Sequence, residues 1–84
     1  MSFTARALEV VRNIPKGKTL SYAEVATLAG SPGAMRVVGS LMKKNFDPTV
    51  PCHRVIRTDG SLGDYNRGGT EAKRRLLAEE GVSL

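Results

Sequence analysis

A cysteine and a histidine stand side by side in Pro51-Cys52-His53-Arg54, and each is the only residue of its type in the chain. A thiolate is the strongest nucleophile among the common side chains, and an imidazole can accept the thiol proton near neutral pH. The preceding proline stiffens the backbone, and Arg54 adds positive charge. These four residues predict a nucleophilic site centred on Cys52.

The length and the residue counts limit what can support this site. We expect one domain over residues 1–84, because this length lies within the usual single-domain range. One cysteine cannot form an internal disulfide, and with one histidine it falls short of a zinc site, so no metal is expected. A free thiol is typical of a reducing compartment, and the chain shows no signal-peptide pattern or membrane-spanning apolar run. We therefore expect a cytoplasmic location and no membrane partner.

Positive charge is concentrated in the middle of the chain. Residues 34–57 carry five cations and one acid, a balance of +4 within a net charge of +5. Such a patch favours anionic partners, nucleic acid among them. A generally basic, solvated surface would have the same composition, so charge alone leaves both interpretations open.

The hydrophobic pattern predicts a mainly helical fold. The expected helices cover residues 3–14, 21–30, 32–44 and 70–80. Ser21 and Glu24 form a capping-box pattern at the start of the second helix, and Ser31 with Pro32 is expected to start the third. Because a short glycine-containing turn separates these two helices, they form a helix-turn-helix candidate.

A short β element is expected after the cysteine. Residues 53–57 are rich in β-branched side chains, and a turn signal follows at residues 58–61. This pattern predicts a small β-hairpin or wing that ends near Tyr65. Loops are expected at residues 45–51 and 64–69, the first because it contains Pro48 and Pro51.

The third expected helix has two faces of different character. Apolar side chains share one side: Ala34, Met35, Val38, Leu41 and Met42. Small and basic residues share the other: Gly33, Arg36, Ser40, Lys43 and Lys44. A small, basic outer face would let the helix approach a phosphate-lined groove closely, whereas a solvated surface helix gains nothing from small residues that weaken it. We therefore favour nucleic-acid binding for this face.

Several separated motifs resemble one protein family. They are Ser21-Tyr22, Arg36-Val37-Val38-Gly39 and Pro51-Cys52-His53-Arg54-Val55. In this order they resemble the C-terminal domain of the O6-alkylguanine-DNA alkyltransferases, also called methylated-DNA–protein-cysteine methyltransferases. The resemblance extends from Phe3 to Gly81. It implies a mainly α, winged helix-turn-helix-like DNA-binding domain with a short β-hairpin or wing, acting as a monomer.

The resemblance implies a DNA repair enzyme that consumes itself. It would transfer a methyl or small alkyl group from O6-alkylguanine in duplex DNA to its own Cys52, in a single turnover and without a cofactor. His53 would remove the thiol proton through a bound water, and Glu80 would orient His53. Tyr22 would help to protonate the departing guanine. Asn45 would link the recognition helix to the active-site loop.

The resemblance also implies how the protein would hold DNA. Arg36 would enter the base stack and replace an extruded nucleotide, because the target atom is inaccessible within a duplex. The other expected DNA contacts are Gly33, Ser40, Lys43, Lys44 and Arg54. The extruded base would occupy a pocket, whose expected residues are Val55, Leu62, Gly63, Tyr65 and Asn66.

Structural roles compete with these functional ones. Cys52 could be a small buried hydrophobe, although its neighbours His53 and Arg54 argue against this. Tyr22 could be a core aromatic residue, and Glu80 could be a surface residue.

The sequence also leaves two alternatives for the protein as a whole. Most family members carry an additional N-terminal domain, which in some holds zinc, whereas this chain starts directly at the DNA-binding domain. Alkyltransferase-like proteins are single-domain relatives that bind alkylated guanine without transfer and recruit nucleotide excision repair proteins as partners. Chain length favours that role, but Cys52 favours transfer, and we give Cys52 more weight because it determines whether the chemistry is possible. A plain winged-helix module with an idle Cys52 is the third possibility.

Overall fold

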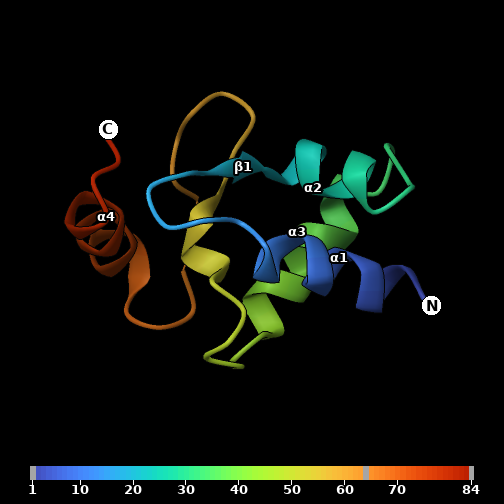
Figure 1. The fold of residues 1–84 in the computed structure, drawn as a ribbon, viewed down its shortest axis with the longest axis horizontal. Helices are drawn as coiled ribbons and strands as arrows, with labels where there is room; N and C mark the ends of the chain where they lie inside the picture. The colour runs from blue at the N-terminus through green and yellow to red at the C-terminus, as the bar shows by residue number, and fades with distance from the viewer. Residues whose placement is uncertain (1, 64, 84) are drawn as a thin grey trace.

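The computed structural model describes residues 2–63 and 65–83 of the chain. Asp64, at which the second predicted loop begins, lies outside these ranges. The elements in chain order are α1 (Phe3–Arg12), β1 (Leu20–Ser21), α2 (Tyr22–Leu28), α3 (Met35–Lys44), the short 3₁₀ helix η1 (Cys52–Arg54), β2 (Val55–Ile56) and α4 (Gly69–Glu79). Helices therefore dominate the fold, as the hydrophobic pattern predicts, and α4 lies at the opposite end of the molecule from the N-terminus (Figure 1).

Within residues 2–63 and 65–83 the two strands pair in parallel, so the β element there is a small sheet rather than the predicted hairpin. Leu20 of β1 pairs with Val55 of β2, and Ser21 pairs with Ile56. After β2 the chain closes a turn, in which the Arg57 amide donates to the Ser61 carbonyl over 2.9 Å. The β-branched residues after Cys52 thus pair with the segment that leads into α2, so they fix the cysteine beside that helix.

The capping box predicted at the start of α2 is confirmed. The Glu24 amide donates to Ser21 Oγ over 3.0 Å, and the Ser21 amide donates to Glu24 Oε1 over 2.9 Å. The first helix also has a serine cap that the pattern did not predict, because Ser2 Oγ accepts from the Ala5 amide. These caps satisfy amides that have no partner within a helix.

The third helix begins later than predicted, at Met35 rather than at Pro32. The reason is that the Ser31 backbone is used to end α2: its amide donates to the Ala26 carbonyl over 2.9 Å, beyond Gly30 with φ +95°. This is the Schellman arrangement, and the residue at the N-cap of α3 is Ala34 rather than Ser31. The Ser31 carbonyl then accepts from the Ala34 amide over 3.0 Å, which closes a turn before α3.

The faces of α3 differ from the prediction at its first turn. Val38 and Met42 are buried and Ala34 and Leu41 are partly buried, but Met35 is 42% exposed. Gly33 lies in the turn before the helix rather than on its outer face. Starting the helix at Met35 leaves this residue in the exposed first turn, outside the core that the later residues enter.

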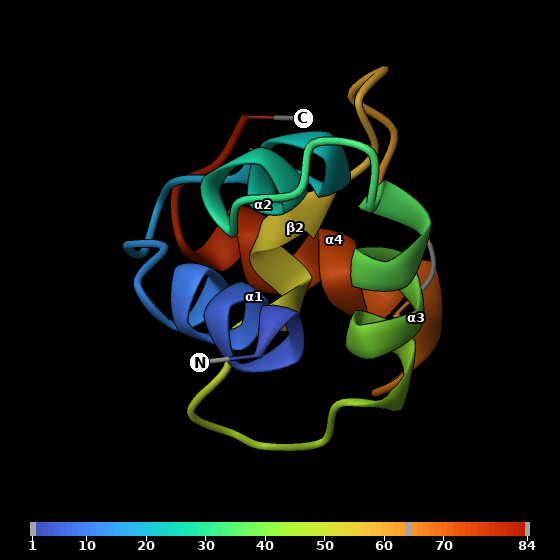
Figure 2. The same cartoon turned by 90° about the vertical axis from the view of Figure 1, so that its right-hand side faces the viewer.

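The core lies between the helices, with η1 and β2 in the middle. Viewed along the long axis, α1, α2, α3 and α4 surround this segment (Figure 2). The buried cluster consists of Ala7, Val11, Ile14, Val25, Ala26, Ala29, Val38, Met42, Val50, Cys52 and Val55. Cys52 is therefore held in the centre of the fold by apolar packing from the first three helices.

The last helix buries a cation that the apolar pattern did not predict. Leu77 is buried, and Ala72 and Leu76 are partly buried, as expected for the inward face. Lys73 is also buried, with 1% exposed, and its Nζ donates to the Leu62 carbonyl over 2.5 Å. Lys73 thus ties α4 to the loop that follows β2.

Candidate functional site

Cys52 is the first residue of η1 and is 4% exposed. Its amide donates to the Val50 carbonyl over 2.8 Å, and the Arg54 amide donates to the Pro51 carbonyl over 2.9 Å. Pro51 precedes the turn and restricts its backbone. The thiol is free, and it is shielded from bulk solvent by the core around it. A reactant must therefore be inserted towards Cys52 rather than meet it at the surface.

His53 forms a close contact with a carboxylate from the far end of the chain. Its Nε2 lies 2.9 Å from Glu80 Oε2, and the two side chains are only 13% and 11% exposed. The pKa of Glu80 is lowered from 4.5 to about 2, first by hydrogen bonding from Arg54 and less by His53, while burial opposes the shift. Because an ionised carboxylate can only accept hydrogen bonds, Nε2 carries the hydrogen. Nδ1 is then the nitrogen that can accept a proton.

Arg54 holds the same carboxylate from its other side. Its Nε donates to Glu80 Oε1 over 2.9 Å and its Nη2 donates to Glu80 Oε2 over 2.8 Å. Its Nη1 donates to the Ile14 carbonyl, just after α1, over 2.8 Å. Three of the five N–H donors of Arg54 thus meet Glu80 and Ile14, which gives Arg54 an internal role in this structure, while its expected contact with DNA stays a prediction. Arg54 fixes the orientation of Glu80 and, through it, of His53.

No direct hydrogen bond joins the Cys52 thiol to the His53 ring among residues 2–63 and 65–83. The His53 ring instead lies edge-on to Tyr65, with centroids 6.3 Å apart and planes at 69°. The pKa of Tyr65 is raised, mainly by burial and further by the nearby Cys52. Cys52, His53 and Tyr65 therefore occupy one partly desolvated region.

A cavity of about 500 Å³ opens beside this region. Tyr22 and Tyr65 line it and also pack against the core cluster that contains Cys52. The remaining lining residues come from three segments: Gly39, Met42, Lys43, Arg57, Asn66, Gly69 and Thr70. Cavities of this volume are typical of small-molecule sites. The two tyrosines therefore connect the cavity to the core cluster in which the thiol lies.

The predicted pocket residues divide into three groups. Tyr65 and Asn66 line the large cavity, whereas Leu62 and Gly63 line a neighbouring one. Val55 lines neither, because its side chain is fully buried within β2. Lys73 lies 5.8 Å from the centroid of the Tyr22 ring, and this buried cation therefore supports the cavity wall from behind.

Asn66 has a structural role that the sequence did not suggest. Its Nδ2 lies within donating distance of the carbonyls of Met42, Lys43 and Asn45, at 3.2, 2.7 and 2.7 Å. These carbonyls lie at the C-terminal end of α3, where backbone partners run out; the Met42 carbonyl also accepts from the Asn45 amide over 3.3 Å. Asn66 thus caps α3 from the cavity wall, and Asn45 is the C-cap residue that it meets.

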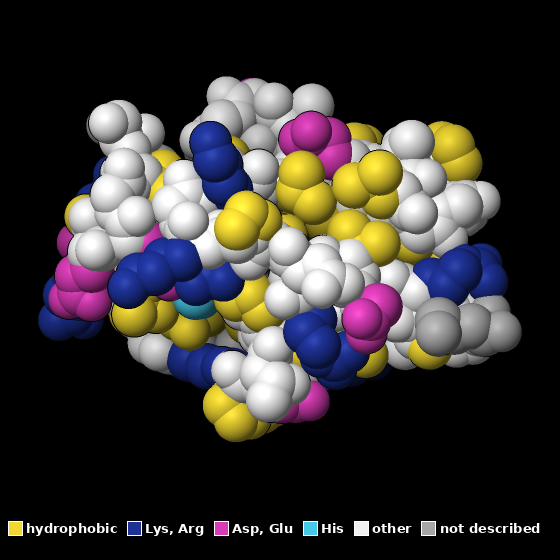
Figure 3. Space-filling model, in the orientation of Figure 1, with side chains coloured by type: hydrophobic (Ala, Val, Ile, Leu, Met, Phe, Trp, Pro, Cys, Tyr) yellow, Lys and Arg dark blue, Asp and Glu magenta, His cyan; other side chains and the backbone are white. Residues whose placement is uncertain are grey.

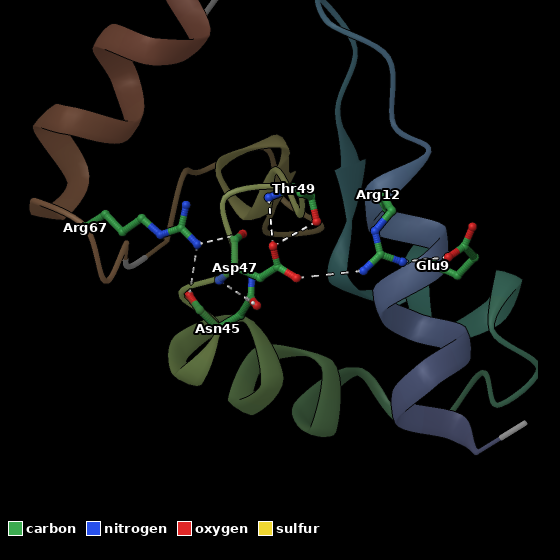
Figure 4. Close-up of polar contacts among 6 residues, drawn as sticks. All are labelled: Glu9, Arg12, Asn45, Asp47, Thr49 and Arg67. Atoms are coloured by element: carbon green, nitrogen blue, oxygen red, sulfur yellow. Dashed lines mark hydrogen bonds and ion pairs between the residues drawn. The ribbon is translucent and has the colours of Figure 1, made fainter.

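The loop between α3 and Cys52 is anchored on both sides (Figure 4). Asp47 Oδ1 accepts from the Thr49 amide over 2.9 Å and from Thr49 Oγ1 over 2.8 Å, and the backbone bond is the main reason why the pKa of Asp47 is lowered. Arg67 Nη2 donates to the Asp47 carbonyl over 2.9 Å, while Arg12 of α1 lies 3.9 Å from Asp47 Oδ2. These contacts hold the backbone that leads to Cys52.

A further hollow, separate from the two cavities above and lined by basic residues, gives His53 access to solvent. It has a volume of about 360 Å³ and is lined by His53, Arg12, Arg54 and Arg67 among others. On this face the small exposed part of a histidine lies between Lys or Arg side chains on one side and hydrophobic side chains on the other (Figure 3). A proton accepted by His53 could therefore leave on this side.

The basic residues predicted for α3 lie at the surface. Arg36, Ser40, Lys43 and Lys44 are exposed, and Lys43 also borders the large cavity. Val37, beside Arg36, is 47% exposed. The outer face of α3 is therefore basic along its length, with apolar contacts at its first turn.

The part of the chain that the structure describes contains neither a metal-binding cluster nor a membrane-spanning helix. Within residues 2–63 and 65–83, no three His, Cys, Asp or Glu side chains are placed to hold a metal ion. No helix within the same ranges has the length and apolar character needed to cross a membrane.

Comparison with known proteins finds relatives over nearly the whole chain. Residues 2–82 match the family described as "6-O-methylguanine DNA methyltransferase, DNA binding domain". A methylated-DNA–protein-cysteine methyltransferase of Methanothermobacter thermautotrophicus is 51% identical over 83 residues, which are 98% of this chain and 46% of that protein. The Homo sapiens protein of the same name is 43% identical over 85 residues, which are 99% of this chain and 41% of that protein. The chain thus spans less than half the length of these relatives.

Two solved structures share the fold. The crystal structure of Mycobacterium tuberculosis OGT in complex with DNA has a TM-score of 0.88 and 43% identity, and the match covers 96% of this chain and 49% of that one. The crystal structure of S. pombe Atl1 in complex with damaged DNA containing O6-carboxymethylguanine has a TM-score of 0.85 and 34% identity. That match covers 96% of this chain and 77% of Atl1.

Proposed function

The chain belongs to the 6-O-methylguanine DNA methyltransferase family, and we propose that it repairs alkylated DNA. Its membership rests on the match of residues 2–82 to the DNA-binding domain of that family. The reaction is transfer of a methyl or small alkyl group from guanine O6 to Cys52. The observation that carries this proposal is a buried thiol beside His53, whose ring is held by the ionised Glu80 at 2.9 Å. This is the arrangement of a nucleophile, a base and an orienting group.

The proposed transfer is a single displacement. The Cys52 sulfur forms a bond to the alkyl carbon while the bond from that carbon to guanine O6 breaks. The thiol proton moves to His53 Nδ1 through one water, and the departing guanine takes a proton from the Tyr22 hydroxyl. His53 then releases its proton to solvent and Tyr22 regains one from solvent, so the net change is one proton from the thiol to guanine. The product is a thioether, which has no proton to lose and no thiolate to regenerate. Each molecule therefore acts once, and no cofactor takes part.

Access to guanine O6 requires that the nucleotide leave the duplex. An enzyme cannot reach this atom in stacked DNA, so the base would turn outward into the cavity lined by Tyr22 and Tyr65. Arg36, which is exposed in the first turn of α3, would fill the gap in the stack. Asn45 and Asn66 join the end of that helix to the cavity wall. Transfer also needs a reduced Cys52, so we propose that the protein acts in a reducing compartment such as the cytoplasm.

The decisive experiment weighs the Cys52 peptide. The protein is incubated with duplex DNA containing one O6-methylguanine, digested and analysed by mass spectrometry, with Cys52→Ser as the control. We expect one added methyl on the wild-type peptide at no more than one per protein molecule, and none on the variant. Saturating binding to the methylated duplex without an adduct would contradict transfer.

Lesion binding without transfer is the second candidate function. Its specific support is that the fold also matches that of Atl1, whose structure was solved in complex with damaged DNA containing O6-carboxymethylguanine, with a TM-score of 0.85 and 34% identity. This function predicts a clear preference for alkylated over unmodified duplex and no adduct. Equal affinity for the two duplexes would instead indicate a plain DNA-binding module.

A further inference from the structure

Arg57 lies where two cavities meet. It lines the large cavity together with Tyr22 and Tyr65, and it also lines a neighbouring cavity of about 440 Å³. The neighbouring cavity is bordered by Arg57, Gly60, Ser61, Leu62, Gly63, Thr70 and Arg74. No Asp or Glu within residues 2–63 and 65–83 lines either cavity. The shared rim is therefore cationic.

A glycine brings the Arg57 side chain close to the Tyr22 hydroxyl. A Cβ placed on Gly63 would lie 3.2 Å from Arg57 Nε, 3.4 Å from Arg57 Cγ and 3.5 Å from Tyr22 Oη. The Arg57 side chain thus crosses directly over the Gly63 backbone, beside the phenol that faces the large cavity. The turn closed between Arg57 and Ser61 fixes where this side chain starts.

Within residues 2–63 and 65–83 no hydrogen bond or ion pair holds the Arg57 guanidinium. Its charge contributes to the lowered pKa of Asp59, but Asp59 Oδ1 accepts from the amide and the hydroxyl of Ser61, at 2.9 and 2.7 Å. The second cation of the rim, Arg74, has only a loose contact of 3.7 Å to Glu71. The rim therefore has the charge and the free donors to bind an anion.

We propose that Arg57, supported by Arg74, binds the phosphodiester group attached to the extruded nucleotide. This inference rests on the proposed function, in which the alkylated base occupies the large cavity. A base in that cavity must leave its sugar and phosphates at the mouth, where Arg57 lies. A guanidinium can hold two oxygens of one phosphate through parallel hydrogen bonds, and this geometry is more specific than a point charge. This phosphate clamp, formed by Arg57 and Arg74, would hold the nucleotide outside the base stack while Cys52 reacts.

The test compares a substrate that carries phosphates with one that carries none. One is duplex DNA containing O6-methylguanine, and the other is O6-methylguanine as the free base. For Arg57→Gln we expect the second-order rate of transfer from the duplex to fall about 10- to 100-fold, as for loss of a charged hydrogen bond. The salt dependence of duplex binding should weaken by about one phosphate contact. Transfer from the free base should stay within about twofold of wild type.

Two further variants sharpen the comparison. Arg74→Gln should reduce transfer from the duplex by a smaller factor, because Arg74 lies farther along the rim. Arg75→Gln is the matched control, since Arg75 is exposed on the same helix but lines neither cavity, and it should leave both rates unchanged.

Each result decides the inference. An equal loss with the duplex and the free base would mean that Arg57 acts on the base, and it would overturn the clamp. The clamp would also be overturned if Arg57→Gln left both the rate of transfer from the duplex and the salt dependence of duplex binding unchanged. If wild-type protein forms no adduct with either substrate, the proposed transfer is wrong. The clamp is then judged by affinity: Arg57→Gln must weaken binding to the alkylated duplex at least about tenfold, or the clamp is wrong too.

Discussion

The contact between Glu80 and its two partners predicts how the stability of the protein depends on pH. Glu80→Gln keeps the shape of the side chain but removes its charge, so it tests the charge alone. In the folded protein the pKa of Glu80 is lowered from 4.5 to about 2, chiefly by Arg54. A carboxyl group with a lowered pKa stabilises the folded state above its unfolded pKa, and this contribution is lost as the pH falls towards the folded pKa.

The size of the effect follows from the two pKa values of Glu80. A change from 4.5 to about 2, at about 1.4 kcal/mol per pKa unit, corresponds to about 3 kcal/mol of folding free energy at pH 7. At pH 3 about half of this contribution remains, and near pH 2 protonated Glu80 resembles glutamine. For so small a chain this is a large fraction of the total stability.

Urea denaturation of both proteins between pH 7 and pH 2.5 measures this difference. We expect Glu80→Gln to unfold with about 3 kcal/mol less free energy at pH 7, and the two proteins to converge as the pH falls below 4.5. Glu79→Gln is the control, because Glu79 is exposed and should change stability by less than about 0.5 kcal/mol. A difference between wild type and Glu80→Gln that is the same at pH 7 and pH 3 would refute the electrostatic explanation.

Two further outcomes test α3, the helix that is proposed to face DNA. Asn66→Ala removes the cap from the last carbonyls of α3 and should lower the free energy of unfolding by about 1–3 kcal/mol. We expect faster hydrogen exchange only in the last turn of α3 and the loop that follows it. Unchanged exchange in that region would contradict the capping role. Arg36→Ala should slow alkyl transfer from methylated duplex DNA by at least about tenfold and leave the alkylation of Cys52 by the free base unchanged. Mass spectrometry of the Cys52 peptide measures both rates. Undiminished transfer from the duplex would count against a role of Arg36 in base extrusion.

A local sequence pattern was sufficient to predict a structural feature where all the residues that form the feature lie in one short segment. The capping box of Ser21 and Glu24 is such a case, because both partners lie within one turn. The start of α3 was wrong because Ser31 has two possible uses, and ending α2 competes with capping the next helix. No local pattern reveals which use is taken, since the answer depends on Gly30 and on the carbonyl of Ala26.

Roles that depend on distant partners could not be predicted from residue types alone. Arg54 is basic and stands in a basic segment, so a DNA contact was the natural expectation, but its donors meet Glu80 and Ile14. Lys73 interrupts an apolar face and would ordinarily be placed in solvent, yet it bonds to the Leu62 carbonyl. The family resemblance supplied Glu80 as the partner of His53, whereas nothing in the sequence indicated that Asn66 caps α3.

The contacts made by Arg54 also determine when the site can form during folding. Arg54 meets Glu80 and Ile14 across 26 and 40 positions of the chain, and His53 meets Glu80 across 27. Contacts so far apart form late, because the intervening chain must first be ordered. A nascent or truncated chain that lacks the end of α4 would hold its cysteine without the group that orients the base. Folding of the whole unit and acquisition of a competent nucleophile are therefore one event.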